Sequence, residues 1–130
     1  MKKKTIALID DDVDFTEATK IYLEGSYNIL TSNEGRKGVD IIKKNKPDLI
    51  VLDLMMPGFD GTEICKELRG YEESKKIPII FFSALGDKFS FMQFMQEYGG
   101  DPNNDIYLSK TVPLDELKAK LGEVISSYLS

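Results

Sequence analysis

The chain has 130 residues, of which 42% are hydrophobic and 30% are charged, and its net charge is -5 at pH 7. This length is sufficient for one domain with its own core. The acidic balance argues against direct nucleic-acid binding, which requires a basic surface. No apolar run approaches the roughly 18 residues of a membrane-spanning helix, and the basic start at residues 2–4 lacks the apolar stretch of a signal peptide.

The cysteine and histidine content limits which disulfides, catalytic groups and metal sites the chain can form. Cys65 is the one cysteine, which excludes an internal disulfide and fits a reducing compartment, so we expect a packed helical thiol in a cytoplasmic protein. The sequence has no histidine. That excludes a Cys–His catalytic pair, a histidine metal site and a phosphohistidine on this chain.

In the first half of the chain, strand and helix patterns alternate. A strand is expected at 4–9, and three carboxylates follow it. A helix is expected next, because apolar residues recur at helical spacing until Gly25, namely Phe15, Ala18, Ile21 and Tyr22. A short strand is expected at 27–31. Ser32 or Asn33 can cap the next helix, whose inward residues are Val39, Ile41 and Ile42.

The alternation continues to the end of the chain. A strand at 48–53 is followed by a helix from Thr62 to Gly70 with its buried side at Ile64, Cys65 and Leu68. Further elements are expected as a strand at 77–83, a helix at 87–98, a strand at 105–109 and a last helix after Pro113. That helix carries the apolar stripe Leu114, Leu117, Leu121, Val124, Ile125 and Tyr128.

This pattern predicts an α/β fold with right-handed crossovers. The strands at 27–31 and 105–109 are the more polar ones and are expected at the edges of the sheet. We therefore predict a single domain over 1–130, a doubly wound five-stranded parallel sheet of flavodoxin-like order 2-1-3-4-5 flanked by five helices.

The segment 49–61 organises the chain, because a continuous apolar run stops at Asp53 and a Pro/Gly/Asp/Gly turn follows at once. Ligands of open parallel sheets bind beyond the carboxyl ends of the strands. The residues found there are Asp10, Asp11, Asp12, Asp53, Ser83 and Lys110. Each alone has an ordinary structural explanation, such as helix capping for Asp12. Their convergence at one edge favours a site.

The residue types at this edge suit phosphoryl transfer. Clustered carboxylates stay ionised only when a cation binds between them. A hard divalent ion that takes oxygen ligands, Mg²⁺ or Mn²⁺, is therefore expected. Carboxylates, a divalent ion, a hydroxyl and a lysine are the parts that position and neutralise a phosphoryl group. An aspartate can itself be the nucleophile and form an aspartyl phosphate.

Over nearly its whole length the chain resembles the receiver domain of bacterial two-component response regulators. The matching segments are 6–12, 31–35, 47–61, 77–84 and 107–110, of which 47–61 is the most specific. The resemblance implies that Asp53 is the phosphoacceptor and that Asp10, Asp11, Asp53 and the Met55 backbone carbonyl hold Mg²⁺. It also implies that Ser83 is the switch hydroxyl, Tyr107 the switch aromatic and Lys110 the partner of the phosphoryl oxygens.

The resemblance further implies a signalling switch rather than a conventional turnover enzyme. Its partner is a sensor histidine kinase or a histidine phosphotransfer protein, and its output passes through an effector domain or downstream protein outside this chain. The output face, and a possible phosphorylation-dependent dimer, involve the elements at 87–98, 105–109 and 114–128. Met55 and Leu85 are apolar at positions that influence water attack, so slow self-dephosphorylation is expected.

Three features depart from the family pattern. Thr111 follows Lys110 where the family usually has proline, and a trans Lys110–Thr111 bond is expected. The segment 99–105 is longer than the usual turn, with a tolerated surface insertion as the favoured explanation. Phe89 and Met92 fall on the outer side of the helix predicted at 87–98, which suggests a partner patch, although single exposed apolar residues are common.

Two other functions remain open on the sequence. The segment 9–13 also fits the haloacid-dehalogenase phosphatase pattern, with Asp10 as nucleophile and Asp12 as acid, but that reading leaves Asp53 unexplained. The second is a receiver-like interaction module that is not phosphorylated. The chain itself fits either a stand-alone receiver or a piece of a longer regulator.

Overall fold

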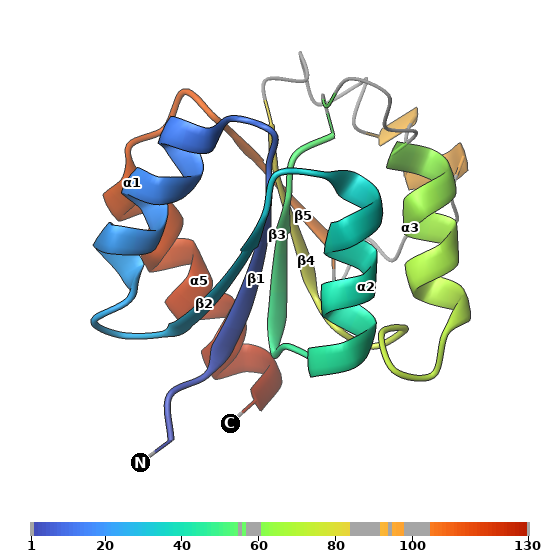
Figure 1. The fold of residues 1–130 in the computed structure, drawn as a ribbon, viewed down its shortest axis with the longest axis horizontal. Helices are drawn as coiled ribbons and strands as arrows, with labels where there is room; N and C mark the ends of the chain where they lie inside the picture. The colour runs from blue at the N-terminus through green and yellow to red at the C-terminus, as the bar shows by residue number, and fades with distance from the viewer. Residues whose placement is uncertain are drawn as a thin grey trace.

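The computed structural model describes residues 2–54, 56, 61–83, 92, 93, 95–97 and 105–129. Its centre is a five-stranded parallel sheet with the order β2-β1-β3-β4-β5, as predicted (Figure 1). The strands are β1 (Thr5–Ile9), β2 (Asn28–Ser32), β3 (Leu49–Leu52), β4 (Ile79–Ser83) and β5 (Asp105–Ser109). The labelled helices are α1 (Val13–Leu23), α2 (Gly35–Asn45), α3 (Gly61–Gly70) and α5 (Leu114–Leu129).

The sheet is covered on both faces, which is why its central strands are apolar throughout. Residues of β1 alternate between two clusters: Ile6 and Leu8 pack toward α1 and α5, whereas Ala7 and Ile9 pack toward α2 and α3 (Figure 1). All four residues of β3 are buried, whereas most residues of the edge strands β2 and β5 are only partly buried. The prediction that β2 and β5 form the edges is confirmed.

The helix pattern holds for the later elements. Ile64, Cys65 and Leu68 are buried on α3, and Leu117, Leu121 and Val124 are buried on α5. Of the helix predicted at 87–98, the described residues 92, 93 and 95–97 are helical. Met95 is buried there and Met92 is 52% exposed, whereas Phe89 lies outside the described residues.

The apolar residues that predicted α1 are mostly on its outer side. The buried residues of this helix are Thr16, Thr19 and Leu23, whereas Ile21 is 64% exposed and Tyr22 is 42% exposed. Apolar spacing located the helix but did not identify its inner face. The Thr16 hydroxyl donates to the Asp12 carbonyl at 2.8 Å and so is satisfied when buried, whereas the buried Thr19 hydroxyl has no hydrogen-bond partner among the described residues.

The expected cap of α2 is also wrong. Glu34 occupies the N-cap position and makes no side-chain capping bond. The Ser32 hydroxyl instead donates to the Glu34 carbonyl at 2.8 Å, and the Asn33 amide reaches the Asp10 carbonyl at 2.7 Å. Both side chains are therefore used in the turn that follows β2, before the helix begins.

An ion pair between Arg69 and Asp105 holds the amino end of the sheet. The Asp105 side chain is fully buried and that of Arg69 is 16% exposed. Arg69 also donates to the Ile77 carbonyl at 2.8 Å, so one guanidinium joins α3, the segment before β4 and the start of β5. Cys65 is fully buried nearby, and burial, followed by the negative charge of Asp105, raises the pKa of its thiol, as suits a packed residue.

Among the described residues, no helix is both long and apolar enough to cross a membrane.

The contact between α2 and β1 gives a stability prediction. A Cβ atom at Gly38 would lie 2.7 Å from Cδ1 and 2.8 Å from Cγ2 of Ile9, a buried β-branched side chain immediately before Asp10. We expect Gly38→Ala to lower the free energy of unfolding by about 1 to 3 kcal/mol, because overpacking outweighs the gain in helix propensity.

Gly122→Ala is the matched control, because a Cβ atom there would meet only the Tyr27 hydroxyl at 3.9 Å. This change in α5 should raise stability by up to about 1 kcal/mol. Urea denaturation measures both variants. A Gly38→Ala protein at least as stable as the wild type would contradict the close approach of α2 to β1.

Candidate functional site at the carboxyl ends of the strands

Two carboxylates lie side by side because β1 and β3 are neighbours in register. Ile9 pairs with Leu52, and the Asp53 amide donates to the Ile9 carbonyl at 3.0 Å. Asp10 and Asp53 are the next residues along each strand, so they leave the sheet together. Asp10 is 1% exposed and Asp53 is 4% exposed.

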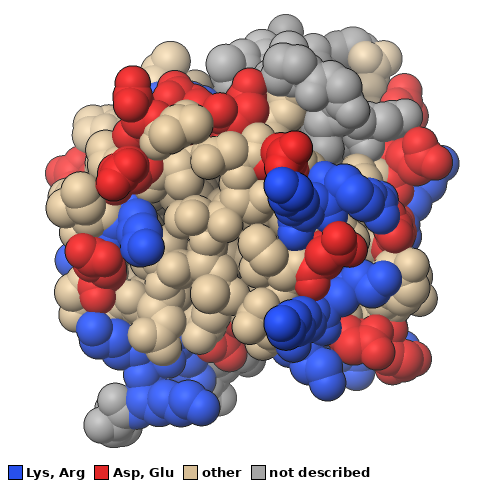
Figure 2. Space-filling model, in the orientation of Figure 1, with Lys and Arg blue, Asp and Glu red and all other residues tan. Residues whose placement is uncertain are grey.

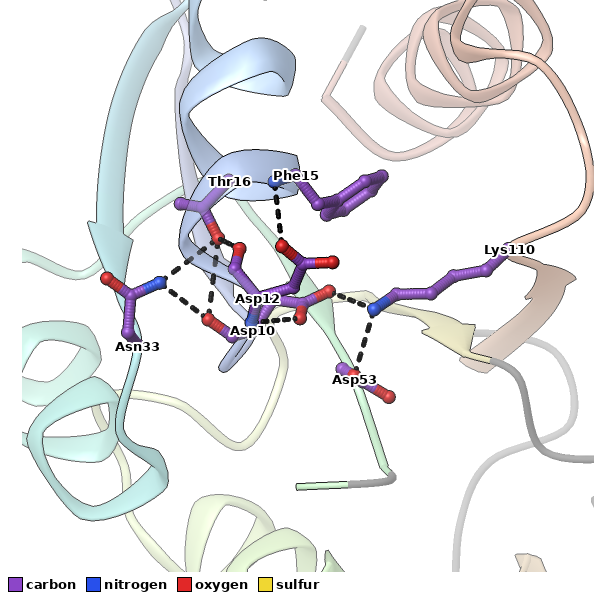
Figure 3. A network of polar contacts seen from close by, with 7 residues as sticks. All are labelled: Asp10, Asp12, Phe15, Thr16, Asn33, Asp53 and Lys110. Carbon is purple, nitrogen blue, oxygen red and sulfur yellow. Dashed lines mark hydrogen bonds and ion pairs between the residues drawn. The ribbon is translucent and has the colours of Figure 1, made fainter. Parts of the chain in front are cut away.

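Lys110 supplies the positive charge for this pair. Its Nζ lies 2.6 Å from Asp10 Oδ2 and 3.0 Å from Asp53 Oδ2, and its side chain is 21% exposed. Figure 3 shows the lysine reaching across from the end of β5 to contact both carboxylates. The predicted convergence of Asp10, Asp53 and Lys110 is therefore observed.

The protonation equilibria follow from this burial. Removal from water raises the pKa of Asp10; the hydrogen bonds from Lys110 and the Asp12 amide oppose that rise, and the nearby charge of Asp53 adds to it. Burial alone would lower the pKa of Lys110, but its bonds and charge interactions with the two carboxylates outweigh burial and raise it. Lys110 is thus an ammonium ion at neutral pH.

Asp11 completes a group of three carboxylates. Asp10, Asp11 and Asp53 each place an oxygen within 4.8 Å of the others, and Asp11 is exposed to solvent. Oxygen ligands of one Mg²⁺ ion lie about 2.1 Å from the metal, hence roughly 3 to 4 Å apart, so small side-chain movements would bring this set to a magnesium site. The donor set, all carboxylate oxygen, suits a hard divalent ion.

Asn33 and Thr16 hold the loop that carries Asp10. The Asn33 amide donates to the Asp10 carbonyl at 2.7 Å and to the Thr16 hydroxyl at 3.2 Å (Figure 3). Neither residue was assigned to the site from the sequence. Asn33 was named as a possible helix cap and lies in the matching segment 31–35, whereas no sequence pattern marked Thr16.

Asp12 acts as a helix cap. Its carboxylate accepts a hydrogen bond from the Phe15 amide at 3.0 Å, as its position before α1 suggested. Asp12 is also exposed, as are Asp11 and Asp14. Figure 2 shows acidic side chains gathered over this end of α1, while basic side chains gather toward the N-terminus.

The structure describes only some of the remaining predicted residues. Ser83 ends β4 and pairs in register with Ser109, and Tyr107 of β5 is partly buried against the cluster under α2 and α3. Met55, Leu85 and most of the segment 99–105 lie outside the described residues. The Lys110–Thr111 bond is trans, as expected, since no cis peptide bond occurs in the described chain.

The comparison with protein families decides the assignment. Residues 6–122 match the response regulator receiver domain family. The chain belongs to this family. Its members are receiver domains of phosphorylation-based two-component signalling, so the family match gives no support to the phosphatase alternative with Asp10 as nucleophile.

Curated relatives agree with this assignment. The chain is 35% identical over 121 residues to the DNA-binding dual master transcriptional regulator RpaA of Synechocystis, covering 92% of this chain and 48% of the relative. It is 34% identical to the phosphate regulon regulator PhoB of Pseudomonas aeruginosa, covering 96% and 53%. The chain thus spans about half the length of these relatives.

Solved structures give the same fold. The receiver domain of Francisella response regulator 1452 aligns with a TM-score of 0.80 at 26% identity, covering 96% of this chain and 98% of that one. The BeF3-activated N-terminal receiver domain of Klebsiella pneumoniae RstA aligns with a TM-score of 0.78 at 28% identity, covering 93% and 97%.

The shared cation predicts a stability effect without added metal. Lys110→Met removes the ammonium group from two carboxylates whose side chains are 2% and 4% exposed. We expect the free energy of unfolding in EDTA to fall by about 3 kcal/mol, because breaking a buried ion pair leaves desolvated charge behind.

Lys110→Arg keeps the charge and serves as the control, with a smaller expected loss. Urea denaturation at pH 7 measures both. Addition of millimolar Mg²⁺ should restore part of the stability of Lys110→Met, because the cation replaces the lost positive charge. Equal stability of Lys110→Met and wild type in EDTA would argue that the pair contributes nothing to the fold.

Proposed function

We propose that this receiver domain is a signalling switch that accepts a phosphoryl group on Asp53. The observation that carries the proposal is the position of Asp53: a nearly buried carboxylate beside a second carboxylate and 3.0 Å from a lysine, at the carboxyl edge of a doubly wound sheet. Phosphoryl transfer needs chiefly positioning and charge neutralisation, and this edge supplies both.

In the proposed reaction, an Asp53 oxygen forms a bond to phosphorus as the phosphorus–nitrogen bond of a donor phosphohistidine breaks. The imidazole leaves with the electron pair. Lys110, already charged and beside Asp53, then pairs with the oxygens of the transferred group. Ser83, at the end of the neighbouring strand, is proposed to contact the same group as the switch hydroxyl.

Asp10, Asp11, Asp53 and the Met55 carbonyl are the proposed ligands of Mg²⁺, with Mn²⁺ as a substitute. The carboxylate cluster supports the first three, whereas Met55 lies outside the described residues. When bound, the ion would supply positive charge to the carboxylates and to the phosphoryl oxygens. Asn33 and Thr16 would hold the Asp10 loop in place for it.

The phosphoryl donor is proposed to be a sensor histidine kinase or a histidine phosphotransfer protein in the cytoplasm. The negative charge of the phosphoryl group on Asp53 would attract the Ser83 hydroxyl and the Lys110 ammonium group. Their movement would change the position of Tyr107 and the shape of the face formed by β5, α5 and the helix at 87–98. An effector domain or separate protein would read that face, with dimerisation through it as one form of output. Self-dephosphorylation is proposed to be slow.

A module that binds partners without phosphorylation is the second candidate, for which Thr111 in place of the usual proline and the longer segment 99–105 leave room. Intact-mass measurement after incubation with Mg²⁺ and acetyl phosphate separates the two. We expect a single phosphoryl adduct that is lost in Asp53→Asn and in EDTA, because the acceptor and the cation are then absent.

Asp12→Asn is the matched control, since it removes a neighbouring carboxylate while an asparagine can still cap α1. It should be phosphorylated like the wild type. Absence of an adduct with acetyl phosphate, phosphoramidate and carbamoyl phosphate would instead favour the non-phosphorylated module.

A further inference from the structure

Lys110 has to span several strands to reach its partners. It follows β5, whereas Asp53 follows β3 and Asp10 follows β1, and β4 lies between β5 and β3. Neighbouring strands are about 4.8 Å apart, so the lysine stem must cross the end of β4 in an extended form. A four-carbon stem has many other rotamers that point into solvent. The contacts of the ammonium group with Asp10 and Asp53 favour the extended rotamer, and a further contact can add to them.

The ring of Phe15 lies beside the ammonium group. Lys110 Nζ is 4.8 Å from the centroid of the Phe15 ring, within the range in which a cation is attracted to an aromatic ring. Figure 3 shows this ring on the α1 side of the ammonium group, with Asp53 on the opposite side. The ammonium group therefore has an aromatic contact as well as two carboxylates.

Phe15 is itself held in place. Its ring centroid lies 5.5 Å from that of Phe82, a residue of β4 that is 1% exposed, with the two planes tilted by 44°. The Asp12 carboxylate accepts a hydrogen bond from the Phe15 amide at 3.0 Å, which fixes the backbone of Phe15 at the start of α1. Phe15 is thus anchored to β4, the strand that Lys110 crosses.

The backbone of Lys110 is held by a hydroxyl turn. The hydroxyl oxygens of Ser109 and Thr111 are 2.8 Å apart, the Thr111 amide donates to Ser109 Oγ at 3.2 Å, and the Val112 amide donates to the Ser109 carbonyl at 3.1 Å. Side chains of this type stabilise turns by bonding to nearby backbone groups. The turn fixes where the lysine stem starts but not where its ammonium group ends.

We propose that Phe15 is a positioning residue for Lys110. Its ring, seated on Phe82, selects the extended lysine rotamer and so keeps Nζ between Asp10 and Asp53, where the proposed phosphoryl transfer requires it. The effect on transfer rests on the proposed function, whereas the effect on the lysine position does not.

The test compares Phe15→Leu, which keeps an apolar side chain but removes the ring, with Phe15→Tyr, which keeps the ring. NMR couplings across the hydrogen bonds from Lys110 Nζ to the carboxyl carbons of Asp10 and Asp53 report whether the ammonium group stays between the two carboxylates. We expect these couplings to persist in Phe15→Tyr and to weaken or disappear in Phe15→Leu. A merely structural role of Phe15 would leave them equal in the two folded variants.

The second readout is the rate of phosphorylation by acetyl phosphate at saturating Mg²⁺. We expect Phe15→Leu to be roughly three- to tenfold slower, the size of one cation–π contact, and Phe15→Tyr to keep most of the wild-type rate. Urea denaturation establishes that each variant is folded, and Phe15→Met replaces Phe15→Leu if the latter is not.

Unchanged couplings from Lys110 Nζ to the Asp10 and Asp53 carboxyl carbons in the variant without the ring would overturn the proposal, as would an unchanged rate. If no variant and no wild-type protein is phosphorylated, the proposed function fails, and the NMR comparison alone decides whether Phe15 positions Lys110.

Discussion

The interaction on which the site depends is the contact of one ammonium group with two nearly buried carboxylates. Lys110 Nζ lies 2.6 Å from Asp10 and 3.0 Å from Asp53. A cation between them offsets the repulsion of two carboxylates held so close together. The same contact joins the end of the edge strand β5 to the central strands β1 and β3. It is therefore both a structural link across the sheet and the charge arrangement that a phosphoryl group would meet.

The sheet is held at its other end by a second buried ion pair. Arg69 of α3 contacts Asp105 at the start of β5, and the Asp105 side chain is fully buried. The edge strand β5 therefore has an ion pair at each end. Arg69 and Asp105 pair at its amino end, and Lys110 pairs with its two carboxylates at its carboxyl end. Of these two, the pair at the carboxyl end lies where ligands of doubly wound sheets bind.

The strand order and the meeting of Asp10, Asp53 and Lys110 could be predicted because they follow from strand periodicity and from the shared carboxyl edge of parallel strands. The inner face of α1 could not, because Thr16 is buried through hydrogen bonds that no apolar pattern records. The contact of Phe15 with Lys110 was missed for a related reason. It joins residues 95 positions apart in sequence, and only the packing of α1 on Phe82 brings the ring to the lysine.

The most direct test of Asp53 as the phosphoacceptor is to locate the phosphoryl group chemically. After phosphorylation by acetyl phosphate, borohydride reduces an aspartyl phosphate to homoserine, and peptide mass spectrometry reports which residue has changed. We predict homoserine at position 53 alone, because Asp53 is the buried strand-end carboxylate that contacts Lys110 and belongs to the cluster with Asp10 and Asp11. Homoserine at position 10 or 11, or at an aspartate distant from this edge, would contradict it.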